Sequence, residues 1–191
     1  ASTSTGPASL LDASDMTWDD IQLYSNLGVD GVDRGYQTLA DFLVLNKDYV
    51  VFLDPKYTHY NHYDEFFEQL KGVPKNQVVI KYYFDNEILA DKARVNGYKS
   101  WGYLYTGDLS NPDLVKFINK WDMLGFPHNA SQNDWDIVLS YGKPVIGHTA
   151  TNSTEYESSI SKGASGVMVG ASTTVDGVGR YEAPPNSSRL G

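Results

Sequence analysis

The sequence predicts an α/β protein of the (β/α)8 TIM-barrel type, and three observations support this prediction. Six short apolar runs typical of strands recur along the chain, and each but the last is followed by a run typical of a helix. The stretches 78–80 and 167–169 are apolar throughout, as in strands buried on both faces. The run before Asp54 and Lys56 places two charged groups at the carboxyl end of a strand, where barrel proteins carry their chemistry.

The segment before this alternation is less regular. A short helix is expected through Trp18 and Leu23, and the Gly-rich stretch 28–35 is expected to be a loop. Thr38 is a good N-cap for an amphipathic helix at 39–45.

From residue 49 onward the expected elements alternate strictly. Asn111 and Pro112 are typical of a helix start, whereas Gly97, Gly142 and Gly163 are typical helix ends. Because each connection is short and contains a helix, the strands are predicted to be parallel with crossovers of one hand. The predicted strands are 49–54, 78–84, 101–105, 123–126, 144–148 and 166–169, and the predicted helices are 63–70, 86–96, 134–141, 154–162 and one that begins at 112.

The length limits how much of a barrel can be present. The chain has 191 residues, of which 41% are hydrophobic, so one sizeable core is expected. A complete eight-stranded barrel usually takes about 250 residues. We therefore expect a partial TIM-barrel domain at 1–180 with about six βα units, followed by a linker or frayed tail at 181–191.

Composition excludes several classes of function. The net charge of −9 and the lack of a Lys/Arg cluster disfavour nucleic acid as a partner, since phosphate binding needs concentrated positive charge. The absence of cysteine excludes disulfides, thiolate nucleophiles and Cys-ligated zinc. No run approaches the roughly 20 apolar residues of a membrane span, so no transmembrane segment is expected.

The strand ends supply the candidate functional residues. Asp54 offers hard oxygen to Mg²⁺ or Ca²⁺, and Lys56, two residues later on the same strand face, could neutralise a phosphate oxygen. An alternative is that Asp54-Pro55 opens a turn and Lys56 is solvated. His148 lies at the end of a later strand, where it could act as a general acid or base or could be a hydrogen-bonded structural residue. Tyr103 is one of several aromatic residues that could stack on sugar or glycerol groups.

Other motifs are weaker. His59 and His62 have the spacing of two zinc ligands on a helix, but a loop at a pocket mouth fits their aromatic and polar neighbours better. Nucleotide-binding glycine loops, the Gly-x-Ser-x-Gly elbow and His-Glu-x-x-His are all missing from the sequence.

The order of segments resembles the glycerophosphodiester phosphodiesterase family, within the barrel phosphodiesterases related to phosphatidylinositol-specific phospholipase C. The likeness covers nearly the whole chain. Four stretches carry it. The first two are 4–7 with Asp12 and 16–21, and Gln37-Thr38-Leu39-Ala40-Asp41-Phe42-Leu43. The third, Val51-Phe52-Leu53-Asp54-Pro55-Lys56, is similar to the family's third strand with its acid-x-Lys ending, and the fourth, 143–149 with 163–169, is similar to its last two strands.

By this resemblance, Asp54 matches a metal-binding acid that is usually Glu, and Lys56 matches a lysine that faces the phosphate. His148 stands where the family usually has Trp, so no family role passes to it. The strands present would be three to eight. The family's His-Arg-Gly, its Glu-x-Asp and its second catalytic histidine all precede this part, so the catalytic histidines are expected upstream, in a missing N-terminal segment that completes the barrel.

The resemblance implies a metal-dependent phosphodiester hydrolase that acts on glycerophosphodiesters or related polymers. Its cofactor would be Mg²⁺ or Ca²⁺ held in part by Asp54, and its substrate would meet Lys56. Tyr103 and His148 are expected to bind the substrate as well, because of their place at strand ends and not because of the resemblance. An extracellular or secreted location is a separate expectation. This segment alone is expected to be inactive. The alternative is a non-catalytic barrel that binds surface carbohydrate or wall polymer in a larger extracellular or virion protein. A glycosidase would need two carboxylates facing one pocket, and Asp54 is the single good candidate in the sequence.

Overall fold

The computed structural model of the chain describes residues 17, 19, 25–27, 33–35, 38–56 and 62–170. The chain divides into two compact units, Ala1–Lys47 and Asp48–Gly191. Trp18 and Leu23 of the expected first helix and the tail expected at 181–191 lie outside the described residues.

The described part of the first unit includes a two-stranded antiparallel sheet and a helix. Strand β1 (Ser25–Leu27) pairs with β2 (Asp33–Gly35), so the prediction that 28–35 is a loop was wrong at its end. Strands of three residues are too short to show the alternation by which strands are predicted, whereas their backbone groups still pair. Helix α2 (Leu39–Leu45) begins as predicted, with the Thr38 hydroxyl accepting a hydrogen bond from the Asp41 N–H at 3.1 Å.

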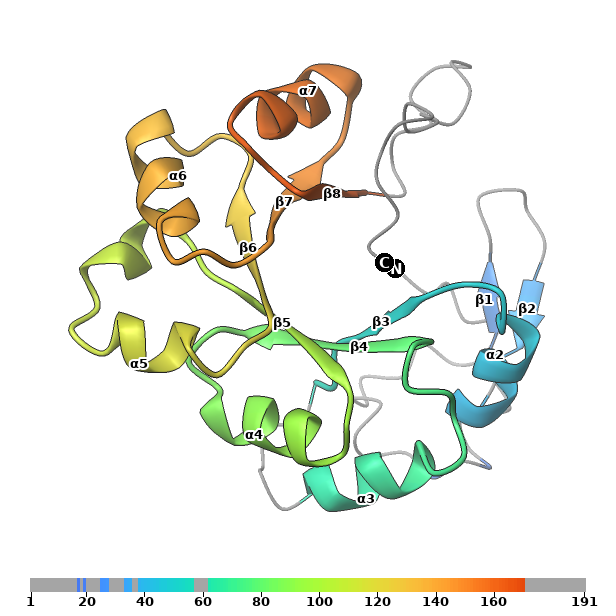
Figure 1. Cartoon of the computed structure of the whole chain (residues 1–191). Helices are drawn as coiled ribbons and strands as arrows, with labels where there is room; N and C mark the ends of the chain where they lie inside the picture. The colour runs from blue at the N-terminus through green and yellow to red at the C-terminus, as the bar shows by residue number, and fades with distance from the viewer. Residues whose placement is uncertain are drawn as a thin grey trace. The chain divides into compact units, whose positions relative to one another are not determined.

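The second unit is a six-stranded parallel sheet in the order β3-β4-β5-β6-β7-β8, with helices between the strands. The sheet is curled into half of a barrel, and helices α3 to α7 lie along its outside (Figure 1). This confirms the predicted partial TIM barrel of about six βα units. The strands are β3 (Val51–Leu53), β4 (Val78–Tyr83), β5 (Lys99–Tyr103), β6 (Met123–Pro127), β7 (Val145–Ala150) and β8 (Gly166–Val169). The helices are α3 (Tyr63–Gln69), α4 (Glu87–Val95), α5 (Leu114–Ile118), α6 (Gln132–Leu139) and α7 (Ser153–Ser161).

Most helix boundaries follow the predicted signals, and the exceptions are α5 and α6. Helix α6 was predicted at 134–141 and lies at Gln132–Leu139, because Ser131 caps it two residues earlier. Gly97, Gly142 and Gly163 end their helices with positive φ angles of 77°, 70° and 101°. Helix α5, however, begins at Leu114 rather than at 112, because a 3₁₀ helix, η3 (Thr106–Ser110), precedes it. The Asp108 carboxylate accepts a hydrogen bond from the Tyr105 N–H at 2.7 Å and closes this extra turn. Within the described ranges no helix has the length and apolar character needed to cross a membrane.

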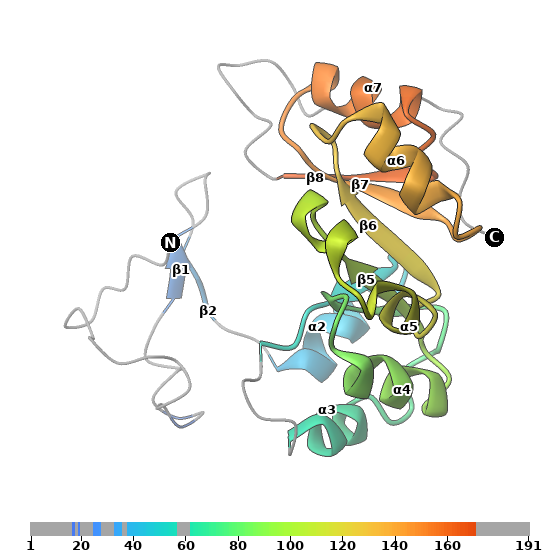
Figure 2. The same cartoon turned by 90° about the vertical axis from the view of Figure 1, so that its left-hand side faces the viewer.

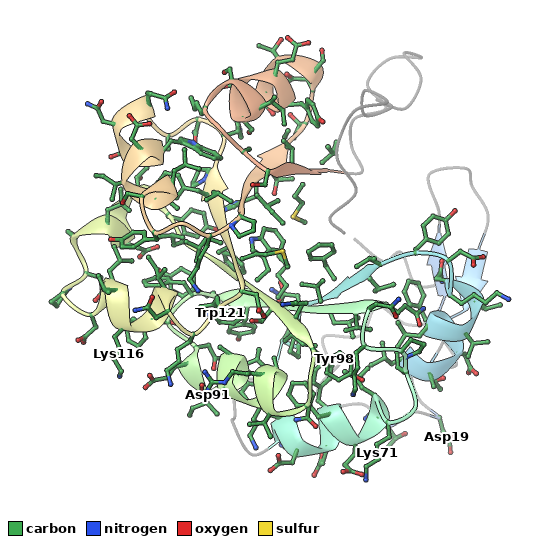
Figure 3. The ribbon with its side chains drawn as sticks, viewed as in Figure 1. Asp19, Lys71, Asp91, Tyr98, Lys116 and Trp121 are labelled. Carbon is green, nitrogen blue, oxygen red and sulfur yellow. The ribbon has the colours of Figure 1, made fainter. Side chains whose placement is uncertain are left out.

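The outer face of the sheet carries the main core. Figure 3 shows Trp121 between the sheet and helices α4 and α5. Its side chain is 1% exposed, and its indole N–H donates a hydrogen bond to the Phe84 carbonyl at 2.7 Å. In Figure 2, helices α6 and α7 cover β6 to β8 in the same way. This packing directs every second residue of each strand outward and leaves the alternate residues facing the inside of the half-barrel.

The inner face has a smaller apolar cluster. Val79, Trp101, Met123 and Ile146, from four adjacent strands, are all buried there. The edge strand differs: the prediction that 167–169 is buried on both faces was wrong, because Met168 and Val169 are each 38% exposed. Strand β8 pairs with β7 on one side and with no other described strand, so fewer side chains cover it.

The buried N-cap of α4 provides a stability test. Asn86 accepts a hydrogen bond from the Leu89 N–H at 3.1 Å and donates one to the Tyr63 hydroxyl at 2.6 Å, and it is 7% exposed. We expect Asn86→Ala to lower the free energy of unfolding by about 2–3 kcal/mol, since the cap and a buried hydrogen bond are lost together. The exposed cap of α7 is the control, and Asn152→Ala should cost about 1 kcal/mol. Urea unfolding measures both, and equal losses would contradict a special role of the buried cap.

Candidate functional site

The carboxyl ends of the strands surround a small pocket inside the half-barrel. Its cavity volume is about 140 Å³, which is room for one small polar ligand, since a water molecule occupies about 30 Å³. Ligand sites of parallel barrels lie at this end of the strands. The four residues predicted from the sequence all line this pocket, which is formed by Asp54, Lys56, Lys81, Trp101, Tyr103, Tyr105, His148, Thr149 and Met168.

Asp54 is the centre of the charged part of the pocket. Its Oδ2 accepts hydrogen bonds from both Lys56 Nζ and Lys81 Nζ, each at 2.8 Å. Its Oδ1 is buried and has no hydrogen-bond partner among the described residues. The hydrogen bond to Asp54 is the main reason why the pKa of Lys56 is raised, so this amine stays charged at neutral pH.

Lys81 is the residue that sequence reasoning left out of the site. Its side chain is 16% exposed, against 72% for Lys56, and its Nζ lies 4.8 Å from the Tyr103 ring centre and 5.5 Å from that of Trp101. Aromatic faces stabilise a cation at such distances. The available signal was a lysine inside the apolar run 78–84, since a charged residue in a buried strand is seldom placed there without a partner.

Aromatic rings form the opposite wall. Tyr103, Tyr105 and Trp101 surround the His148 ring, with centre-to-centre distances of 5.9, 5.5 and 6.3 Å. Burial, followed by the charge of Asp54, raises the pKa of Tyr103, so its phenol keeps its proton and can donate it in a hydrogen bond. Gly125 makes room for this wall, because a methyl group there would lie 2.5 Å from the Trp101 indole nitrogen.

His148 is a neutral residue at physiological pH. Burial lowers the pKa of His148 to about 4, with Lys81 adding to the effect and the backbones of Leu104 and Gly125 opposing it. Its Nε2 is buried without a hydrogen-bond partner in the part of the chain that the structure describes. A histidine of this kind is a poor proton acceptor at pH 7, so a role in holding the ligand and the pocket wall fits it better than general base chemistry.

A divalent cation is not well matched by these residues on their own. Asp54 Oδ1 could serve as one oxygen ligand, yet two ammonium groups lie 2.8 Å from the other oxygen of the same carboxylate. Across the described ranges no group of three His, Asp or Glu side chains could hold a metal ion. The metal stays a prediction, which needs ligands beyond those described.

The remaining sequence candidates lie away from the pocket or outside the described residues. His62 lies at the start of α3 and contacts Glu65 at 3.2 Å, whereas its possible zinc partner His59 is not described. The pocket instead gathers side chains from β3, β4, β5, β7 and β8 or from the residues that directly follow them.

Comparisons with known proteins bear on the fold of this site. No family model matches the chain, and no curated protein matches it in sequence. Solved structures do match. One, described as a glycerophosphoryl diester phosphodiesterase from Silicibacter pomeroyi, is 12% identical with a TM-score of 0.59, over 81% of this chain and 64% of that one. Another, from Parabacteroides distasonis, is 13% identical with a TM-score of 0.60, over 82% and 60%. A third, from Galdieria sulphuraria, is 10% identical with a TM-score of 0.61, over 81% and 66%.

The chain has the fold of these phosphodiesterases. The resemblance noted in the sequence is thus confirmed at the level of fold. Sequence identities of 10–13% support the shared fold alone. The chain spans less than two thirds of the length of each of these phosphodiesterases.

Proposed function

We propose that this chain forms the larger part of a phosphodiester hydrolase that acts on glycerophosphodiesters or on related glycerol-phosphate polymers. The observation that carries the proposal is the Lys56–Asp54–Lys81 cluster, which stands in a pocket at the carboxyl ends of the strands in a phosphodiesterase fold. A further segment would supply the remaining strands and the histidines that move protons. A divalent cation, Mg²⁺ or Ca²⁺, would polarise the phosphoryl oxygens if that segment completes its ligands around Asp54.

The chain's own residues would bind and orient the substrate. Lys56 is exposed at the pocket mouth and can meet a non-bridging phosphate oxygen, while Asp54 keeps its ammonium group in place. The phenol of Tyr103 can donate a hydrogen bond to an ester or hydroxyl oxygen. The rings around His148 shield one side of the pocket from water, which strengthens these charged contacts.

The test is release of glycerol phosphate from a glycerophosphodiester by the complete gene product that contains this chain. We expect turnover, and we expect Lys56→Ala to lower it roughly 100-fold, the usual effect of removing one stabilising group from a developing oxyanion. Lys116→Ala, on the outside of α5, is the control and should retain activity (Figure 3). Absence of turnover on any phosphodiester by the folded complete protein, with metal present, would rule the proposal out.

The second candidate function is binding without catalysis. A barrel that binds surface carbohydrate or wall polymer is favoured by the ring cluster of Trp101, Tyr103 and Tyr105, since aromatic faces stack on sugar rings. The neutral His148 fits this function equally well. Tight binding of a wall polymer, with no product released by the complete protein, would select it. An extracellular or secreted location stays a prediction for both.

A further inference from the structure

The charge of the pocket is opposite to that of the chain. The chain carries a formal net charge of −9, yet the pocket holds the two ammonium groups of Lys56 and Lys81 against the one carboxylate of Asp54. His148 adds no charge at pH 7, because its pKa is about 4. The pocket therefore has one positive charge in excess, which favours an anionic ligand.

The hydrogen-bonding capacity of the two lysines points the same way. Each ammonium group has three N–H donors, and the structure assigns one from each lysine to Asp54 Oδ2. The Tyr103 and Trp101 rings lie close to Lys81 Nζ, but they accept no conventional hydrogen bond from it. Donors on both lysines are thus available to a further acceptor in the pocket.

A cation in the same pocket would be repelled by the two lysines. Any ion bound to Asp54 Oδ1 would lie next to two ammonium groups that already share the carboxylate's charge. Asp54 is also the single carboxylate that lines the pocket, as far as the described residues go. The geometry suits Asp54 as a counter-ion that holds two lysines together.

From this we propose that Lys56 and Lys81 bind the phosphate group of the ligand directly, with Asp54 as their counter-ion, and that this binding needs no divalent cation. The inference rests on the proposed function for the class of ligand, a phosphate ester of a small polyol. It adds Lys81 as a binding residue and gives Asp54 a role opposite to that of a metal ligand.

The experiment is calorimetric titration of the complete gene product that contains this chain with sn-glycerol 3-phosphate, with inorganic phosphate and with an intact glycerophosphodiester, each in excess EDTA and in millimolar Mg²⁺ or Ca²⁺. We expect the same affinity with and without the cation. Lys81→Gln should weaken binding at least about tenfold, which is the loss of one charge-assisted hydrogen bond. Asp54→Asn should strengthen binding roughly fivefold, because it removes a competing negative charge and leaves two ammonium groups to neutralise.

The controls separate charge from folding. Asp91 on α4 also holds two cations, Arg94 at 2.6 Å and Lys120 at 2.8 Å, but it lies on the outer surface (Figure 3), so Asp91→Asn should leave binding unchanged. Because Lys81 is half-buried, Lys81→Arg tests whether a retained charge preserves binding. Lys56→Gln changes the same site at an exposed position.

The outcomes distinguish this inference from the proposed function. Binding that appears only with a divalent cation, and that is lost in a folded Asp54→Asn variant, would show that Asp54 is a metal ligand and would overturn the inference while leaving the hydrolase proposal intact. No binding of any of the three ligands by the folded complete protein would also overturn it. Cation-independent binding in a protein that never releases product would uphold the inference and reject the hydrolase.

Discussion

Replacing Trp121 by Ala is expected to lower the free energy of unfolding by about 3–5 kcal/mol. Its ring is 1% exposed and fills the space between the sheet and helices α4 and α5, so a large cavity would remain. The Phe84 carbonyl would also lose the indole donor that lies 2.7 Å away. Urea unfolding followed by circular dichroism measures the loss, because that signal does not depend on the removed indole.

The neighbouring Gly102 makes this prediction sharper. A methyl group at Gly102 would lie 2.6 Å from the Trp121 ring, so Gly102→Ala should cost about 1–3 kcal/mol in the natural protein. In the Trp121→Ala background the same change should cost much less, since the ring is gone. Gly107→Ala is the control, because its methyl group would meet no atom within 4 Å. Equal costs of Gly102→Ala in both backgrounds would contradict the contact.

Acid should destabilise the protein through His148 before the bulk of its carboxylates titrate. The pKa of His148 is about 4 in the folded chain and 6.5 in the unfolded chain, so the unfolded state binds one more proton between these values. The stability that His148 contributes is therefore fully present above pH 6.5 and is lost as the pH falls toward 4. The difference in pKa corresponds to roughly 3 kcal/mol.

The measurement is the free energy of unfolding at several pH values between 7 and 4.5, for the natural chain and for His148→Phe. The variant keeps an aromatic ring in the wall but cannot titrate, so its stability should fall less as the pH is lowered. Parallel curves for His148→Phe and the natural chain would show that His148 is not buried in its neutral form.

Much of the fold was predictable because its signals are local. Caps such as Thr38 and Asn86 and stops such as Gly97 and Gly163 act within one turn of their helices. The apolar runs that became β4 and β6 lie buried in the sheet, as continuous hydrophobic segments usually do. The late start of α5 was not predictable, because it depends on the extra turn that Tyr105 and Asp108 close ahead of it.

The site was predictable in part. Asp54, Lys56, Tyr103 and His148 were selected because each follows or ends a strand, and all four line one pocket. Their roles in binding are still predictions. Tyr105 was read as the end of a strand. The apolar run around Lys81 marks this lysine as unusual, but no local signal shows that it meets a carboxylate 27 residues earlier in the chain.

The sequence by itself determined the order and kind of elements in the half-barrel, since period, capping and turn residues act over a few neighbouring positions. Only the tertiary structure decided which side chains meet. The parallel register pairs Leu53 with Ile80, and the residues that follow, Asp54 and Lys81, then lie side by side on adjacent strands. Contact between distant parts of the chain, and the burial that lowers the pKa of His148, arise from packing that no single segment encodes.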